Sequence, residues 1–355
     1  MSYSPIDKPT DFFNSVLYTG NGSSPRSITG VGFQPDFNWT KSRSASGSHV
    51  LANSVSGANK QLVSNNNSAE ATNGAYGYLS AFGSDGWTMT TGSSDFSRMN
   101  TNSTTYVSWN WLAGTSFTND ASATGIGTID SAGSRNTDAG FSIISYTGTG
   151  SAATVAHGLG STPKMIIVKN RSSSQHWQVY HISTGNTKSS QLSGGGGADT
   201  ASTYWNNTSP TSTVFSIGTG TPTNGNGNAI IAYCFVEKQG YSKFSSYVGN
   251  GSASSGPFVY TGFKPAFVMI KRTDSTSSWE MYDAKREGFN PQVHALYANG
   301  SNAEDNTDDL LDLLSNGFKL YHDGGGLNAS GSSYIFMAFA SNPFTTSTGI
   351  PACAR

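Results

Sequence analysis

The sequence predicts an all-β protein made of three tandem antiparallel β-sandwich repeats of jelly-roll or lectin type. Three observations predict this fold: one segment recurs three times, its internal spacings agree, and short apolar runs alternate with turn residues along the chain. They divide the 355 residues into an N-terminal arm, three repeats, a linker and a tail. The predicted bounds are 1–12 (arm), 13–114 (repeat 1), 115–140 (linker), 141–239 (repeat 2), 240–344 (repeat 3) and 345–355 (tail).

The recurring segment contains a tyrosine, a Gly-x-Gly pair, a proline and a lysine, in that order. The proline follows the tyrosine by 17, 17 and 18 residues, and the lysine follows the proline by 6 in every copy. These positions are Tyr18, Pro35 and Lys41; Tyr146, Pro163 and Lys169; and Tyr247, Pro265 and Lys271. Spacings that agree in three places indicate three divergent copies of a unit of about one hundred residues, an ordinary size for a domain.

The composition supports ordered β-structure with an uncharged polar surface. Charged residues are 12% of the chain, about half the usual ~25%, whereas aromatic residues are also 12%, which disfavours disorder. The net charge is −1 without a basic run, so a nucleic-acid partner is not expected. No apolar run approaches the ~20 residues of a membrane span, and the N-terminus does not have the pattern of a signal peptide.

Taken in order, the elements begin with an arm in which Pro5 and Pro9 disfavour regular structure, so that it either frays or docks on a partner. In the first repeat, alternation of apolar and polar residues predicts short strands, and Gly83–Gly86 predicts a hairpin between two of them. These strands are expected at Val16–Tyr18, Phe37–Lys41, His49–Val55, Leu79–Phe82, Trp87–Thr90 and Tyr106–Trp111.

The second and third repeats follow the same plan with two departures. The segment 115–140 is rich in small polar residues and is interpreted as a linker or surface loop. Met165–Val168 is almost wholly apolar, as expected of a strand that is covered on both faces. Asp308–Ser315 is the one segment that predicts a helix, with Asn306 or Thr307 as its cap and Asn316-Gly317 at its end.

Residues with the spacing of a catalytic or metal site are not found in the sequence. The six histidines form no metal-binding motif, and the acidic cluster at residues 304–312 resembles a solvated helix face more than a calcium loop. The Gly-x-Gly pairs lack the further residues of a phosphate loop, so they are interpreted as turns that the fold requires. We therefore expect a protein that is not an enzyme and that uses no cofactor or metal.

Three sets of residues remain as candidates for contacts. Lys41 and its counterparts, each with a nearby arginine, either end a strand edge or contact a neighbouring subunit. Trp177 and Trp279 recur at one position and predict core packing or a contact between repeats. Tyr204 and Trp205, in a Thr- and Asn-rich loop, are the candidate ligand-binding residues, because an exposed aromatic face stacks on sugar C–H groups. Cys234 and Cys353 either pair or stay reduced; the reduced form is favoured.

The segments Asn136–Arg171 and Ser27–Phe37 resemble a repeat family of virion structural, tail-fibre-like proteins of marine tailed phages. The ending at 349–355, GIPACAR, is similar to the usual C-terminus of that family, which implies a complete chain. The resemblance implies a virion location, and it carries no catalytic residues to this sequence.

The expected function is therefore a non-enzymatic phage virion surface protein, assembled in the host cytoplasm. It would be a tail-fibre-like or receptor-binding component, with loops such as 194–209 facing the host and a host surface glycan as a possible ligand. The alternative is a capsid decoration protein, a head fibre or knob docked through its termini. A polysaccharide depolymerase is a third hypothesis, for which no carboxylate pair is evident. Its expected partners are other virion proteins of the tail or capsid, and a homo-oligomer, with a trimer favoured, is expected.

Overall fold

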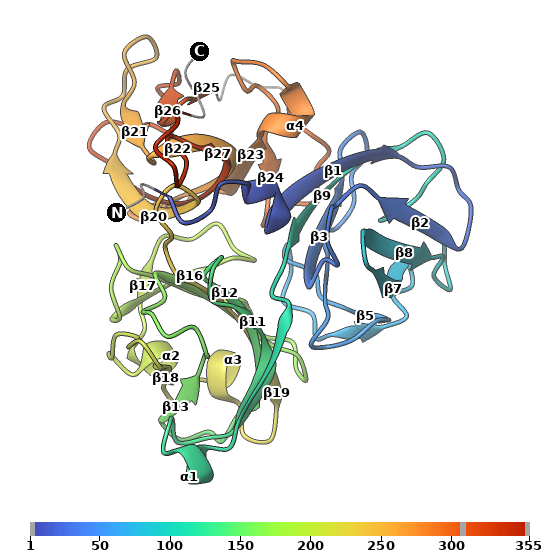
Figure 1. Cartoon of the computed structure of the whole chain (residues 1–355), viewed down its shortest axis with the longest axis vertical. Helices are drawn as coiled ribbons and strands as arrows, with labels where there is room; N and C mark the ends of the chain where they lie inside the picture. The colour runs from blue at the N-terminus through green and yellow to red at the C-terminus, as the bar shows by residue number, and fades with distance from the viewer. Residues whose placement is uncertain (1–3, 306–309, 352–355) are drawn as a thin grey trace.

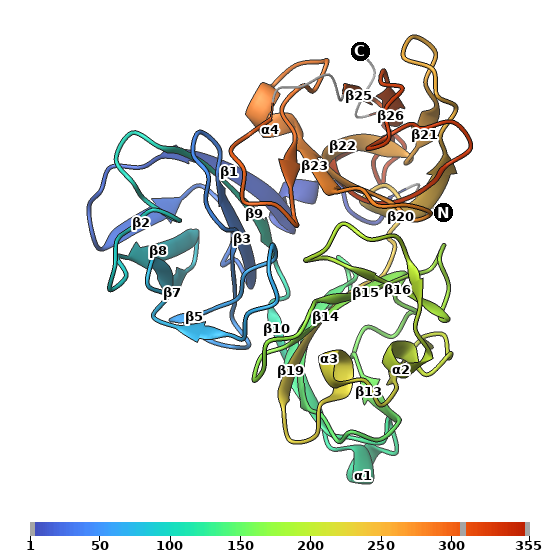
Figure 2. The same cartoon turned by 180° about the vertical axis from the view of Figure 1, so that it is seen from behind.

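The computed structural model describes residues 4–305 and 310–351, and it is an all-β protein with antiparallel sheets. Helical structure in the described residues is limited to single turns. These are the 3₁₀ turn η1 (Pro9–Asp11) and α1 (Ala121–Thr124), α2 (Ser202–Trp205), α3 (Thr221–Asn224) and α4 (Ala284–Glu287). The chain forms three lobes around a common centre (Figures 1 and 2). We call them unit 1 (13–114), unit 2 (115–239) and unit 3 (240–344).

Each unit has one larger sheet, and the same four strands occupy it in the same order. In unit 1 the order is β1 (Phe13–Thr19), β9 (Thr105–Trp111), β3 (Phe37–Ser42), β4 (Val50–Asn53). In unit 2 it is β12 (Phe141–Thr147), β19 (Ala229–Phe235), β14 (Met165–Asn170), β15 (Gln178–His181), extended by β16 (Lys188–Gln191) and β17 (Asp199–Thr200). In unit 3 it is β20 (Ser242–Val248), β27 (Ser333–Pro343), β22 (Phe263–Arg272), β23 (Trp279–Asp283), followed by β24 (Leu296–Tyr297).

Each unit also has a smaller sheet that covers the outer face of the larger one. In unit 1 it contains β2 (Arg26–Thr29), β8 (Gly86–Thr90) and β7 (Tyr78–Gly83). In unit 2 it contains β13 (Ala153–Ala156) and β18 (Val214–Ile217), and in unit 3 β21 (Phe258–Tyr260), β26 (Gly317–Leu320) and β25 (Leu311–Leu314). A further pair, β5 (Lys60–Gln61) and β6 (Ala71–Thr72), lies beside β4 of unit 1.

The three larger sheets share one apolar core between their inner faces. Strand alternation explains this arrangement: Met165 and Ile167 of β14 enter the central core, whereas Ile166 and Val168 enter the core of unit 2 alone. Aromatic rings from different units meet at the centre; the centroids of Phe37 and Tyr233 are 4.4 Å apart. The prediction that Met165–Val168 is covered on both faces is confirmed, and the second cover is supplied by the other units.

The Gly-x-Gly pairs form turns that a buried asparagine holds in each unit. The backbone N–H after the first glycine donates to Oδ1 of Asn100, Asn224 or Asn328, at 3.0, 2.7 and 2.8 Å. A Cβ on the first glycine would lie within 2.4 Å of a backbone oxygen in every unit, and the second glycine has a φ of 68 to 72°. The interpretation of these pairs as turns that the fold requires is therefore confirmed.

The expectation that 115–140 is a linker is wrong. The segment forms β10 (Thr115–Asn119), α1 and β11 (Ser131–Asn136), and β11 pairs with β12, so the sheet of unit 2 gains two strands. The sequence signal for these two strands was weak because this edge of the sheet packs few large apolar residues. Its small polar residues are satisfied instead by ladder hydrogen bonds and by the Asp120 cap of α1.

The predicted helix at Asp308–Ser315 is also wrong where the structure describes it. Leu311–Leu314 is strand β25, paired with β26, and Leu314 lies opposite Gly317. Leu311 and Leu313 alternate into the core of unit 3, and Ser315 and Asn316 form a hairpin turn, so that Gly317 begins β26 instead of ending a helix. Cross-strand packing therefore overrides the local helix propensity. Asp308 and Asp309, with the proposed caps, lie outside the described residues.

The N-terminal arm is packed on its own chain from residue 4. Ile6 is buried in the central core, and η1 contacts β1 and β27. Asp7 then accepts hydrogen bonds from the backbone and hydroxyl of Ser347, at 2.6 and 2.5 Å. The described ends of the chain therefore meet on unit 3.

The shared core predicts that a single unit does not persist as a folded monomer. A fragment of residues 141–239 would expose the inner face of its sheet, including Phe141, Met165, Trp177 and Tyr233. Each aromatic ring covers 150–250 Å², so this face exceeds the apolar patch that a typical monomer tolerates. We expect oligomers or aggregates in size-exclusion chromatography with light scattering, against a monodisperse full-length control. A monomeric fragment that unfolds cooperatively would contradict the shared core.

Candidate functional site

The units are joined by three equivalent junctions, each with a ring donor from one unit and a backbone carbonyl of the next. Trp177 of unit 2 donates to the carbonyl of Val63 in unit 1, and Trp279 of unit 3 donates to Gln191 in unit 2, both at 2.9 Å. In unit 1 the same position, eight residues after the repeat lysine, holds His49, whose Nε2 lies 2.9 Å from the carbonyl of Tyr297 in unit 3. The junctions therefore run around a closed ring. Both predictions for the recurring tryptophans, burial and contact between units, are confirmed.

The repeat lysines are buried at these junctions. Strand alternation places Lys41, Lys169 and Lys271 on the inner face, and each side chain is fully covered. The ammonium of Lys169 donates to the carbonyls of Gln175 and, across the junction, Asn67; that of Lys271 donates to Gly195 of unit 2. Burial lowers the pKa of all three to about 8. Lys169 and Lys271 thus join units of the same chain, whereas Lys41 donates to Ser42 of its own strand. All three lie on internal strands, so of the two alternatives the strand-edge role is wrong.

Two junctions add an arginine–glutamate pair, and the third replaces it. Arg43 donates to both oxygens of Glu304 at 2.8 and 3.0 Å, and Arg171 binds Glu70 at 2.7 and 2.9 Å. The backbone N–H of each glutamate also donates to the carbonyl of its arginine. At the third junction the matching backbone bond joins Ala198 to Thr273 at 2.8 Å, and neither residue is charged.

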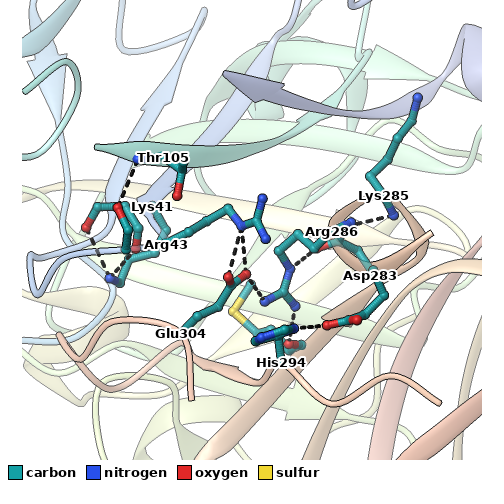
Figure 3. A network of polar contacts seen from close by, with 12 residues as sticks. Lys41, Arg43, Thr105, Asp283, Lys285, Arg286, His294 and Glu304 are labelled. Carbon is teal, nitrogen blue, oxygen red and sulfur yellow. Dashed lines mark hydrogen bonds and ion pairs between the residues drawn. The ribbon is translucent and has the colours of Figure 1, made fainter. Parts of the chain in front are cut away.

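The junction of units 1 and 3 carries a larger polar network (Figure 3). Arg286 on α4 donates to Glu304 at 2.8 Å, to Asp283 at 2.5 Å and to the carbonyl of Met281. Asp283 caps α4 and also accepts from the indole of Trp109 in unit 1, at 3.1 Å. The side chain of Arg286 is 1% exposed and that of Asp283 is fully covered, so this is a buried network that joins two units.

The charges in this network stabilise one another. Burial alone would raise the pKa of Glu304, but the hydrogen bonds and charges of Arg43 and Arg286 outweigh it and hold that pKa below its ordinary value. Burial likewise acts to lower the pKa of Arg286, yet the carboxylates of Asp283 and Glu304 raise it. Each charged side chain of the network is paired with an opposite charge, so the network acts as a structural clamp between the two units.

Three buried histidines are held in one neutral tautomer. In His49, His157 and His181 the Nδ1 atom accepts a hydrogen bond while Nε2 faces a backbone carbonyl, so Nε2 must carry the proton. Burial lowers the pKa of His49 to about 3 and those of His157 and His181 to about 4. His49 and His181 both reach unit 3, so their neutral state supports contacts between units.

The candidate stacking residues Tyr204 and Trp205 do not form an exposed aromatic pair. Trp205 is 2% exposed and lies in the core of unit 2 with its ring edge against Tyr180, centroids 5.9 Å apart. Tyr204 is half-buried against the same core. The expectation of a stacking site that includes Trp205 is wrong, because α2 turns this side chain inward. The nearby glycine run also differs from the expected host-facing loop, since Gly195 and Ala198 bond unit 3 at a junction.

A cavity of about 330 Å³ opens in unit 2 beside the segment that the other units lack. Its apolar wall consists of Phe117, Ile126, Ala156 and Leu159. Polar groups come from Arg135, Asn119 and the exposed residues Thr137, Ser212 and Thr213. Two of its walls, Phe117 on β10 and Arg135 on β11, belong to the 115–140 segment, so the cavity exists because of the insertion.

Gly158 shapes this cavity. A Cβ at Gly158 would lie 2.9 Å from both Arg135 Cδ and the ring of Phe117, and the residue has a φ of +72°. The guanidinium of Arg135 donates to the Gly158 carbonyl at 2.8 Å and lies over Phe117, 5.1 Å from its centroid. Arg135 was not among the candidate residues predicted from the sequence, although it stands in the segment that breaks the repeat spacing.

Among residues 4–305 and 310–351, no cluster of three or more His, Cys, Asp or Glu side chains is placed to hold a metal. In the same part of the chain, no helix is long and apolar enough to cross a bilayer. Cys234 is a buried free thiol, whereas Cys353 lies outside the described residues.

The fold and the junctions define an all-β protein whose three units close around one core. A family model described as a domain of unknown function, DUF7483, matches residues 8–343, nearly the whole chain. The chain therefore belongs to the DUF7483 family. A search of curated proteins finds no match.

Proposed function

We propose that the chain is a non-enzymatic structural protein of the phage virion surface, in a tail-fibre-like or receptor-binding position. We also propose that its units are three tandem copies of one β-sandwich, of the jelly-roll or lectin type predicted above. The resemblance of residues 136–171 and 27–37 to phage virion repeat proteins supports the location. The chain is rich in uncharged polar residues, and hydrogen bonds connect each unit to both of the others. Both features suit a protein that works outside the cell.

One observation carries the receptor-binding role: the 115–140 insertion, which breaks the shared plan of the described units, creates a cavity that the fold does not require. The described ends of the chain meet on unit 3, where Asp7 bonds Ser347. The turn α1 lies at the tip of the lobe of unit 2, away from unit 3 (Figure 1). Attachment through the termini would therefore leave the insertion facing outward.

Capsid decoration is the alternative, and the meeting of both ends on one lobe also suits it. However, Ser4 and Ile6 are buried in the protein itself, so this part of the arm is not available to a shell. Assembly with other virion proteins, as a homo-oligomer and preferably a trimer, remains a prediction; the threefold arrangement already exists within one chain.

Immunogold electron microscopy of virions of the phage that encodes the chain tests this proposal. Antibody raised to the purified chain is expected to label the tail, with pre-immune serum as control. Label over the head would contradict the receptor-binding role and would support the capsid decoration role instead. Intact particles without label, alongside label in infected-cell lysate, would contradict both virion roles.

A further inference from the structure

We propose that the cavity of unit 2 binds a sugar ring that carries a carboxylate, of the uronic acid type, within an acidic glycan. This inference rests on the proposed receptor-binding role, which makes a host glycan the source of the ligand. The chemistry of the ligand comes from the lining of the cavity.

The charge of the ligand follows from Arg135. Among the described residues, it is the one charged side chain that lines the cavity, and no carboxylate of the same part of the chain forms an ion pair with it. Its described contacts are the Gly158 carbonyl and the ring of Phe117. A guanidinium has five N–H donors, so several remain for a ligand, and a carboxylate matches two of them at once.

The shape of the ligand follows from the two kinds of wall. Phe117, Ala156 and Leu159 supply apolar surface to the cavity, and Thr137, Ser212 and Thr213 supply hydroxyl-bearing side chains on its exposed rim. A pyranose has the same division, with an apolar C–H face and hydroxyl groups around its edge. A volume of about 330 Å³ is at the small end of ligand cavities, which suits one or two rings. A flat aromatic acid would leave the hydroxyl rim without a partner.

Gly158 makes the arrangement preorganised. Because it has no side chain, the ring of Phe117 and the stem of Arg135 both lie directly over its backbone. Arg135 is thus fixed by a carbonyl at one nitrogen and by a ring at its face before any ligand arrives. A fixed donor loses less conformational freedom on binding than a free surface arginine.

Binding is measured on the full-length protein by ligand-observed NMR and calorimetry. The probes are methyl glucuronide, its uncharged counterpart methyl glucoside, and benzoate. We expect the glucuronide to bind at least tenfold more tightly than the glucoside, and more weakly at high salt. Arg135→Gln should reduce glucuronide binding at least tenfold, and Ser212→Trp, an exposed rim substitution, should block it. Arg135→Lys should restore part of the affinity.

The control variant is Arg26→Gln in unit 1. Arg26 also donates to a backbone carbonyl, that of Thr19 at 2.7 Å, and lies over a ring, 5.4 Å from the centroid of Tyr18. It should change binding by less than twofold. Equal binding of glucoside and glucuronide, preference for benzoate, unchanged binding in Arg135→Gln, or no binding by the folded protein would each overturn the inference. Binding to purified protein is independent of where the chain sits in a particle, so the two proposals fail separately.

Discussion

Acidification from neutral pH to about pH 4 is expected to unfold the protein. The pKa values of His49, His157 and His181 are lowered from the ordinary 6.5 to about 3, 4 and 4. Below pH 6.5 the unfolded chain binds protons that the folded chain does not, so stability falls as the pH falls towards these values. At pH 4 each histidine then costs about 3 kcal/mol, because one pKa unit corresponds to about 1.4 kcal/mol. Together they remove about 10 kcal/mol, comparable to the 5–15 kcal/mol stability of a typical protein.

The hydrogen bonds explain why these histidines resist protonation. Nδ1 of His49 accepts a hydrogen bond from the indole N–H of Trp39 at 2.8 Å. A proton added to Nδ1 would therefore point its N–H at the indole N–H and break this hydrogen bond. The buried ammonium of Lys41 disfavours the charge further, after burial itself. The ring therefore has to leave its buried position to become charged, and its hydrogen bond with the carbonyl of Tyr297 in unit 3 is then lost.

Urea unfolding at a series of pH values, followed by circular dichroism, measures this loss. Glutamine can donate and accept in place of neutral histidine but does not titrate, so His49→Gln should move the acid midpoint to lower pH. His176, which is exposed and bonds Ser193, offers the matched control: His176→Gln should leave the midpoint unchanged. Stability that is flat between pH 6.5 and 4 would show that the buried histidines do not control it.

Replacing Arg286 by methionine is expected to destabilise the protein by about 3–5 kcal/mol, because it leaves Asp283 buried without its cation and Glu304 with Arg43 alone. The substitution should destabilise both units at this junction, because Asp283 also bonds Trp109 of unit 1 and Glu304 also bonds Arg43 of unit 1. Urea denaturation gives the magnitude. Hydrogen exchange should show faster exchange in β3 and in the segment around Glu304.

The surface pair of Lys243 and Glu237 is the control for this substitution. Its side chains are 31% and 27% exposed, so Lys243→Met should cost at most about 1 kcal/mol. Similar losses for the two variants would mean that the network contributes no more than an ordinary surface pair. Adding Asp283→Asn to Arg286→Met should recover part of the stability, because it removes the buried charge that the first substitution leaves unpaired.

Much of the β-structure was predictable because it depends on local signals. Alternation located β3, β7, β8 and β9, and the Gly-x-Gly pairs marked turns that only glycine can form. Even the asparagines that hold these turns had a signal, because Asn100, Asn224 and Asn328 each stand five residues before the last strand of their unit. A spacing conserved among the three units of one sequence carries information that a single unit does not.

What the sequence analysis missed depends on contacts between distant segments. Leu310, Leu311, Leu313 and Leu314 together fit a helix pattern, whereas Leu311 and Leu313 alone fit strand alternation, and only pairing with β26 decides between the two. Trp205 stands among polar residues, yet the core of unit 2 covers it. The lysines were recognised as a recurring set, but their burial follows from the closing of three sheets around one centre, which periodicity does not encode.

The closed ring of junctions has a consequence for how such a molecule can change. In a ring of three identical chains, every substitution appears three times and every junction must accept it. A single continuous chain lifts this restriction: one junction has Thr273 and Ala198 where the others have arginine and glutamate, and one lobe alone gained the 115–140 segment. Each molecule then offers one copy of the cavity, so multivalent attachment would have to come from the number of molecules on a particle.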